Sequence, residues 1–157
     1  MVRVVYRIAI VDDNETWCYT LKAVLQHHSF NVSTFTDAYE FLNVAWQFDL
    51  ALIDFSMPTR LFKRELDGSQ VITQVKERVK NPPFLVLISS YFTKDSLAVA
   101  QQICPNADAY LSKSSGLTRI VGLVKDVAAN QPKLNASTPS PSERDAQETR
   151  HRSNLRT

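Results

Sequence analysis

Cysteine is scarce in this 157-residue chain, which has only Cys18 and Cys104. Both fall within apolar helical patterns, so we expect buried free thiols in a reducing compartment rather than a disulfide. No apolar run approaches the roughly 20 residues that a membrane helix needs. The first residues interleave charged and apolar side chains, which is not the pattern of a signal peptide. The sequence therefore predicts a cytoplasmic protein with no membrane span.

Charge of one sign is also lacking, because 18 basic and 16 acidic residues leave a net charge of +2. This excess is too small to indicate a nucleic-acid-binding protein. All of it falls in the last part of the chain, which is rich in Ser, Thr, Pro, Asn and Arg and has too few large apolar side chains to order itself. We expect a folded domain over residues 1–129 and a disordered tail over residues 130–157. Nothing after the last helical pattern resembles a DNA-binding segment, so no direct DNA binding is expected.

Short apolar runs alternate with segments of helical period over most of the chain. The runs cover residues 4–11, 32–35, 50–53, 84–88 and 109–112. The helical pattern after the first run has a core-facing stripe, which comprises Trp17, Leu21, Val24, Leu25 and His28. Helices are also expected from Asp37 to about Phe48, where Asp37 and Glu40 have capping-box spacing, from Asp67-Gly68, from about residue 94 to 104, and from Leu117 onward. This alternation predicts an α/β fold, with a five-stranded parallel sheet that carries helices on both faces.

Polar residues follow four of the five expected strands. They are Asp12-Asp13, Asp54, Ser89-Ser90 and Ser112-Lys113. In an open parallel sheet, ligands bind outside the carboxyl ends of the strands, so we expect these side chains to gather at one edge. Aspartate after a strand often only caps the next helix, and Asp54 alone would permit that interpretation. The combination of residues favours a site.

Three carboxylates at one edge repel one another unless a cation offsets their charge, and Mg²⁺ prefers such oxygen ligands. The ammonium group of Lys113 adds fixed positive charge that suits phosphoryl oxygens. A carboxylate beside both can attack a phosphoryl donor in line and form an acyl phosphate. The hydroxyl of Ser89 can then donate a hydrogen bond to a phosphoryl oxygen.

These features resemble the receiver domain of bacterial two-component response regulators over about residues 4–128. The resemblance rests on five segments in the expected order: residues 8–13, 50–58, 67–68, 85–90 and 109–113. It implies a doubly wound, flavodoxin-like sheet with strand order 2-1-3-4-5. It also implies that Asp54 is the phosphoacceptor, and that Mg²⁺ is held by Asp12, Asp13, Asp54 and the backbone carbonyl of Ser56. Lys113 matches the lysine that contacts the phosphoryl group.

The same resemblance assigns Ser89 as the switch hydroxyl and Tyr110 as the switch aromatic, although Tyr110 could equally be a simple core residue. Phosphorylation is then expected to draw Ser89 toward Asp54, to let Tyr110 turn inward, and to reshape the surface formed by the fourth helix, fifth strand and fifth helix. A histidine kinase or histidine phosphotransferase is the implied donor, and a downstream protein is the implied reader. A homodimer through the same surface is compatible with the resemblance. The resemblance does not say whether phosphate is relayed onward or the pathway ends here.

Two features depart from the family pattern. Ser114 follows Lys113 where many members have a proline in a cis peptide, which we interpret as a change in loop rigidity. The stretch between Asp54 and Gly68 is about six residues longer than expected and contains the basic and apolar segment 59–66, although Pro58, four residues after Asp54, matches the loop proline of the family. That segment is either a tolerated surface insertion or a partner-selective loop near the site.

Two other functions compete with the phosphorylation switch. A receiver that cannot be phosphorylated could serve only as a protein-binding module. The five positions of the expected site nevertheless carry residues that suit phosphorylation, which are Asp12, Asp13, Asp54, Ser89 and Lys113. A phosphohydrolase with an aspartyl nucleophile also places that residue at a strand end, but such enzymes carry a second acid two residues later, where this chain has Ser56. We therefore expect no true enzyme, only self-phosphorylation from small donors and self-dephosphorylation.

Overall fold

The structure, a computed structural model, describes residues 5–57, 65–93 and 96–130. Its elements follow one another as β1 (Arg7–Val11), α1 (Glu15–His27), β2 (Asn31–Phe35), α2 (Ala38–Val44), η1 (Ala45–Gln47), β3 (Leu50–Asp54), α3 (Gly68–Arg78), β4 (Phe84–Ser89), α4 (Leu97–Ile103), β5 (Ala109–Ser112), η3 (Lys113–Ser115) and α5 (Leu117–Asn130). None of the helices within these ranges is long and apolar enough to cross a membrane. Pro58, most of the segment 59–66 and the predicted tail from residue 131 lie outside the described residues.

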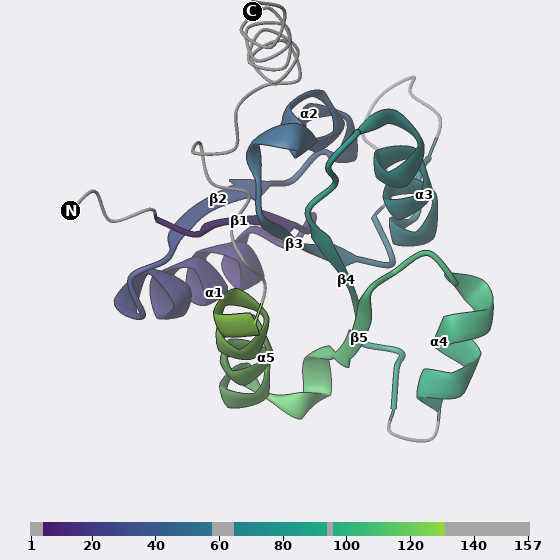
Figure 1. The fold of residues 1–157 in the computed structure, drawn as a ribbon. Helices are drawn as coiled ribbons and strands as arrows, with labels where there is room; N and C mark the ends of the chain where they lie inside the picture. Colours follow the sequence, from purple (N-terminus) through teal and green to yellow (C-terminus); the bar gives the residue numbers. More distant parts are fainter. Residues whose placement is uncertain (1–4, 58–64, 94–95, 131–157) are drawn as a thin grey trace, which may run out of the picture.

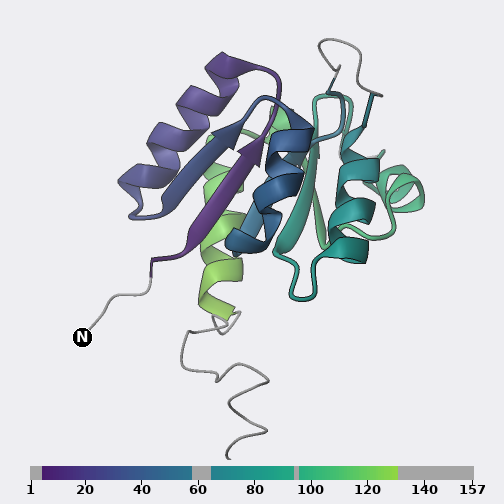
Figure 2. The same cartoon turned by 90° about the horizontal axis from the view of Figure 1, so that it is seen from above.

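All five strands run parallel in one sheet, in the order β2-β1-β3-β4-β5 (Figures 1 and 2). This is the strand order that the family resemblance implies, so the doubly wound α/β fold is confirmed. The register pairs Val11 of β1 with Ile53 of β3, and Ser89 of β4 with Ser112 of β5. The polar residues at the ends of these strands are therefore brought to the same edge of the sheet.

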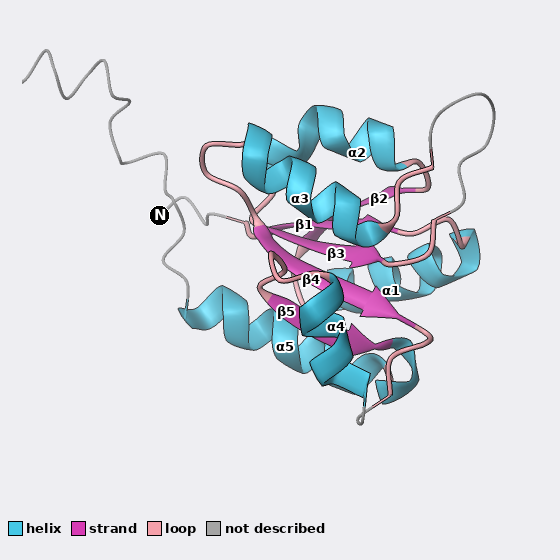
Figure 3. Cartoon of the chain, turned by 90° about the vertical axis from the view of Figure 1, so that its right-hand side faces the viewer, coloured by secondary structure: helices cyan, strands magenta, loops and turns pink. Residues whose placement is uncertain are grey.

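Helices cover both faces of the sheet, as Figure 3 shows. One face packs against α1 and α5, and the other against α2, α3 and α4. Every residue of the central strand β3 is buried, because side chains that alternate between the faces meet a helix layer on either side. On α1 the predicted stripe is largely confirmed: Leu21 and Leu25 are fully buried, whereas Trp17 and Val24 are partly buried.

The starts of two helices were predicted from their polar residues. At α3 the prediction is confirmed, because Asp67 is the N-cap and forms a reciprocal capping box with Gln70. Asp37 is the N-cap of α2 and accepts a hydrogen bond from the Tyr39 N–H. This helix ends at Val44 and passes into the short turn η1, so it is shorter than the sequence pattern suggests. Likewise, α4 covers Leu97–Ile103, the central part of the predicted helix.

Candidate functional site

Three carboxylates meet at the edge of the sheet. Asp54 is the last residue of β3, and Asp12 and Asp13 follow the neighbouring strand β1. One carboxylate oxygen from each of the three lies within 4.8 Å of the other two. Asp12 and Asp54 are 1% and 6% exposed, and Asp13 is more open to solvent. The predicted acidic cluster therefore forms, with two members buried and one at its mouth.

Lys113 provides the positive charge of the site. It follows β5 and begins the η3 turn, in which the Ser112 hydroxyl accepts a hydrogen bond from the Ser114 N–H. Its Nζ lies 2.5 Å from Oδ2 of Asp12 and 3.5 Å from Oδ1 of Asp54. The sequence predicted this lysine near the three aspartates, and the structure brings all four together. At the position where many family members have a proline, the N–H of Ser114 donates a hydrogen bond to the Ser112 hydroxyl and forms part of the η3 turn.

Burial and mutual repulsion alter the protonation of the carboxylates. Burial, and next the charge of Asp12, raise the pKa of Asp54 to about 7, although Lys113 opposes the shift. Burial also raises the pKa of Asp12, against the opposing effects of Lys113 and the Asn14 N–H. For Lys113 burial alone would lower the pKa, but the hydrogen bond to Asp12 and the charge of Asp54 raise it. The site is therefore short of positive charge.

The donor set fits a hard divalent cation. Three ionised carboxylates and one ammonium leave a charge of about −2, which one divalent ion balances. The donors are oxygens, as Mg²⁺ prefers. Ser56, whose backbone carbonyl is a further ligand that the family resemblance implies, lies two residues beyond Asp54 and is exposed. With Glu65 and Asp67 it lines an open cavity of about 370 Å³. An acidic triad with this chemistry is consistent with a Mg²⁺ site.

The start of α1 holds Asp12 in place. Asp12 Oδ1 accepts the Asn14 N–H at 2.9 Å, and the Cys18 thiol donates to the Asp12 carbonyl at 3.2 Å. Asn14 in turn caps α1 by accepting the Trp17 N–H. The Trp17 ring centroid lies 5.2 Å from Nζ of Lys113. Sequence reasoning placed Trp17 and Cys18 in the core and missed both contacts, because helical period alone does not reveal a side chain at the end of a stripe that reaches the site.

Backbone hydrogen bonds to β4 and to the start of α3 fix the end of β3. The N–H of Phe55, next to Asp54, donates to the Ile88 carbonyl, and the Phe55 carbonyl accepts the Gly68 N–H, both at 2.8 Å. Ser89 lies one residue beyond Ile88, the register partner of Asp54. Its buried hydroxyl accepts the Tyr91 N–H at 3.1 Å. The predicted switch serine is therefore at the strand end next to Asp54.

Comparison with known proteins identifies the family. The family model of the response regulator receiver domain matches residues 8–125, most of the chain. The chain belongs to the receiver domain family. A comparison with curated proteins finds no match.

Solved receiver domains share its fold. The BeF3-activated receiver domain of DrrB, a Thermotoga maritima protein, is 21% identical, with a TM-score of 0.66 over 81% of this chain and 100% of that chain. The response regulator TrrA of Thermotoga maritima, in complex with Mg²⁺-BeF, is 24% identical, with a TM-score of 0.64 over 78% and 98%. Vibrio cholerae CheY4, a chemotaxis protein, is 18% identical, with a TM-score of 0.62 over 79% and 99%.

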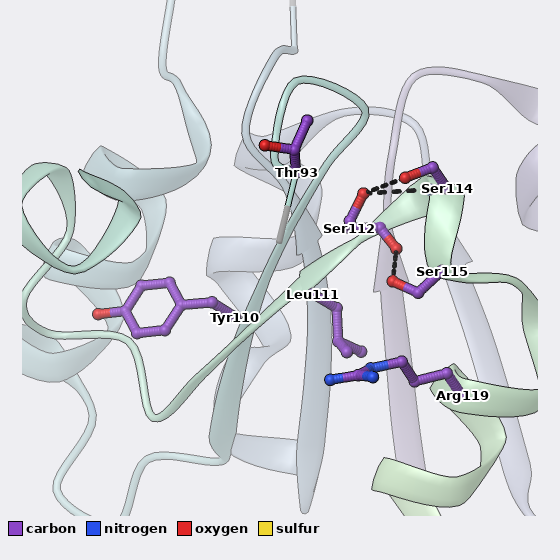
Figure 4. A pocket seen from close by; sticks show the side chains of 7 residues that line it. All are labelled: Thr93, Tyr110, Leu111, Ser112, Ser114, Ser115 and Arg119. Carbon is purple, nitrogen blue, oxygen red and sulfur yellow. Dashed lines mark hydrogen bonds between the residues drawn. The ribbon is translucent and has the colours of Figure 1, made fainter. Parts of the chain in front are cut away.

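Tyr110 of this receiver domain packs against the α4 side of the sheet. It is partly buried against the core on that face, and its hydroxyl donates to the backbone carbonyl of Cys104, just after α4. Figure 4 shows its ring pointing away from Ser112. A cavity of about 100 Å³ beside β5 is lined by Thr93, Tyr110, Leu111, Ser112, Ser114, Ser115 and Arg119. Tyr110, the predicted switch aromatic, thus borders a cavity formed by β5, the η3 turn and the start of α5.

Proposed function

We propose that this receiver domain is a response regulator that accepts a phosphoryl group on Asp54 in a Mg²⁺-dependent reaction. The observation that carries the proposal is the placement of Asp54, which is buried among two further aspartates and lies 3.5 Å from the Lys113 ammonium. A lone capping aspartate would not need these neighbours. The chain would act as a switch, with self-phosphorylation and self-dephosphorylation as its only reactions.

Asp12, Asp13, Asp54 and the backbone carbonyl of Ser56 are the residues that would hold Mg²⁺. When bound, the ion supplies positive charge that offsets the carboxylates and the phosphoryl oxygens. Asp12 is fixed for this purpose by the Asn14 N–H and Asp54 by its position at the end of β3. Because the site is prearranged, little reorganisation is needed when the charge arrives.

In the transfer step, a carboxylate oxygen of Asp54 attacks the phosphorus atom and forms a new P–O bond. The bond between phosphorus and the donor breaks, and its electron pair leaves with the donor. A phosphohistidine of a histidine kinase or histidine phosphotransferase suits this reaction, since its imidazole leaves as the P–N bond breaks. Lys113 lies close enough to Asp54 for its ammonium to pair with the negatively charged phosphoryl oxygens once the group is attached. Water attack on phosphorus later restores the carboxylate and releases phosphate.

The acyl phosphate would be read through Ser89 and Tyr110. The Ser89 oxygen accepts the Tyr91 N–H, and its O–H is a donor that a phosphoryl oxygen can receive. Movement of Ser89 would loosen the β4–α4 loop and allow Tyr110 to leave Cys104. A downstream protein would then recognise the altered α4–β5–α5 face, or a second copy would pair through it. We assign residues 1–129 to this cytoplasmic switch and residues 130–157 to a tail.

Intact mass spectrometry tests the proposal. The protein is incubated with a small acyl phosphate and Mg²⁺, beside Asp54→Asn and a sample with EDTA. One added phosphoryl group in the first sample only is the expected result. No gain in any sample, together with no Mg²⁺ binding by calorimetry, would contradict the switch and favour a receiver fold retained for protein binding. A phosphoryl group that persists in Asp54→Asn would place the acceptor elsewhere.

A further inference from the structure

The indole ring of Trp17 is the third neighbour of the Lys113 ammonium. The distance from Nζ to the ring centroid is 5.2 Å, within the range of a cation–π contact. The other two neighbours are the carboxylates of Asp12 and Asp54. The lysine side chain is 18% exposed, so these contacts act on a partly desolvated charge, where cation–π attraction is stronger than at an open surface.

Four residues form a closed ring of contacts that includes Trp17. Asp12 Oδ1 accepts the Asn14 N–H at 2.9 Å, and Asn14 Oδ1 accepts the Trp17 N–H at 3.0 Å. The Trp17 ring faces Lys113, and Lys113 returns to Oδ2 of Asp12 at 2.5 Å. The backbone of Trp17 is thus fixed through Asn14 by the same aspartate that pairs with the lysine, and the indole reaches the ammonium from this position at the start of α1.

Core packing alone does not account for this indole. The buried residues of α1 that fill the sheet-facing side of the helix are Cys18, Leu21 and Leu25. Trp17 is only partly buried at the margin of that core. An aliphatic side chain could cover the same margin, whereas only an aromatic ring offers a face to which a cation is attracted.

We propose that Trp17 is a positioning residue for Lys113 in the phosphoryl-binding site. The inference rests on the proposed function, because Lys113 is assigned there to the phosphoryl oxygens. We expect a phosphoryl group on Asp54 to draw the ammonium of Lys113 away from Asp12 and toward its own oxygens. A hydrogen bond to Asp12 is short and directional, but the attraction to a ring face varies gently with position. The indole therefore keeps the lysine at the site while its ammonium exchanges Asp12 for the phosphoryl oxygens.

Tryptophan fluorescence tests the contact without any phosphoryl group. The chain has two tryptophans, and Trp46 is 67% exposed in the η1 turn, so Trp46→Phe leaves Trp17 as the single tryptophan to be excited selectively. In that background, Lys113→Met is expected to change the emission intensity or wavelength, since a cation leaves the ring face. Superimposable spectra would show that no such contact exists in solution and would overturn the inference.

A double-mutant cycle tests the role in binding. Calorimetry measures the affinity for beryllofluoride, a stand-in for the phosphoryl group, in the presence of Mg²⁺. Trp17→Leu is expected to weaken binding by about 2- to 30-fold, the range of a cation–π contact, and Trp17→Phe by less because it keeps a ring. In the Lys113→Met background, Trp17→Leu should have less than about a twofold effect, because the two residues act together. Trp46→Leu is the matched control and should leave the affinity unchanged.

The outcomes separate the two proposals. Equal losses on Trp17→Leu in both backgrounds would mean that the indole acts only through packing, which overturns the positioning role but not the switch. Wild-type protein that binds Mg²⁺ but neither beryllofluoride nor a phosphoryl group would count against the proposed function itself. The positioning role would then fall with it, even if the fluorescence experiment had established the contact.

Discussion

Gly68, the first residue of α3, packs so tightly against Asp54 that a β-carbon on it would stand 2.4 Å from the Asp54 carbonyl oxygen. The Gly68 N–H also donates to the Phe55 carbonyl at 2.8 Å. The start of α3 therefore rests directly on the backbone of the proposed phosphoacceptor. The close approach requires glycine here because any other side chain would overlap the strand end.

Gly68→Ala is expected to displace α3 from the end of β3. The new methyl group would also stand 2.8 Å from the Leu87 side chain, so neither the backbone nor the core can accept it unchanged. We expect a loss of about 1–3 kcal/mol in the free energy of unfolding, as for other overpacked sites, together with weaker Mg²⁺ binding. Urea unfolding and calorimetry measure the two effects.

Gly122→Ala is the matched control for this substitution. Gly122 lies within α5, and apart from the adjacent helix backbone no atom of the described residues comes within 4 Å of the position of its β-carbon. Alanine there should stabilise the helix by up to about 1 kcal/mol. If both substitutions had the same effect, the contact with Asp54 would not be what restricts position 68.

The parallel α/β sheet and the acidic cluster were predictable because both depend on patterns that the sequence displays directly, whereas the strand order was implied by the family resemblance. Apolar runs mark the strands, and polar residues at their ends converge wherever parallel strands are neighbours. Asp12, Asp54 and Lys113 were found in this way. The Asp67-Gly68 helix start was also found, because a cap and a glycine leave a local signature.

Other features depend on how side chains lie in space. Trp17 has the helical period of a core residue, and only the three-dimensional arrangement places its ring beside Lys113. Tyr110 was left open between a core and a switch role. It is partly buried and also bonded to the Cys104 carbonyl, a partner six residues away that no spacing rule indicates. The end of α2 was overestimated, since helix ends depend on local capping more than on period.

Removal of the Asp54 charge is expected to change how stability depends on pH in metal-free buffer. The pKa of Asp54 is raised from 3.8 to about 7 by burial, with the charge of Asp12 as the next cause. Between these values the folded protein binds a proton that the unfolded chain releases, so the stabilisation present at low pH is lost as pH rises toward 7. Asp54→Asn has no such loss. Its advantage over wild type should grow by about 1–3 kcal/mol from pH 5 to pH 8.

Urea unfolding in EDTA across that range measures the difference. The same series in excess Mg²⁺ is the control, because a cation bound to the folded state offsets the repulsion and should reduce the advantage of Asp54→Asn. Parallel pH curves for the two proteins in EDTA would show that Asp54 titrates as an exposed carboxylate does.

Asp108 is expected to matter more for stability than its ion-pair partner Lys76. The Lys76 ammonium is 3.0 Å from the carboxylate, but both side chains are partly exposed. The same carboxylate accepts the Leu85 N–H at 2.9 Å, and the Asp108 N–H donates to the Leu85 carbonyl. Asp108→Ala should cost about 1–3 kcal/mol because it strips a backbone donor of its partner. Lys76→Ala should cost less than about 1 kcal/mol.

Salt distinguishes the two contributions of Asp108. In 1 M NaCl the effect of Lys76→Ala should shrink, since an exposed ion pair is screened, whereas the effect of Asp108→Ala should largely persist. Thermal or urea unfolding of both variants at low and high salt provides the comparison. Equal losses that disappear together in salt would assign the whole effect to the ion pair.

Tyr110→Phe is expected to loosen α4 from β5. The Tyr110 hydroxyl donates to the Cys104 carbonyl and so fastens the residue after α4 to the middle of the α4–β5–α5 face. Its loss should lower the free energy of unfolding by about 0.5–1.5 kcal/mol. It should also raise amide hydrogen exchange in α4 more than in α1, because only the former loses a contact.

Tyr91→Phe is the control for this last change, because Tyr91 is 76% exposed and should tolerate loss of its hydroxyl. Since the bond to Cys104 holds Tyr110 on the α4 side, its loss should also favour the inward position of the ring. Beryllofluoride and Mg²⁺ would then bind Tyr110→Phe more tightly than wild type, as a ligand does when its preferred state is already more populated. Weaker binding by Tyr110→Phe would mean that the hydroxyl supports the phosphorylated form instead, and that the bond to Cys104 is not what the switch must break.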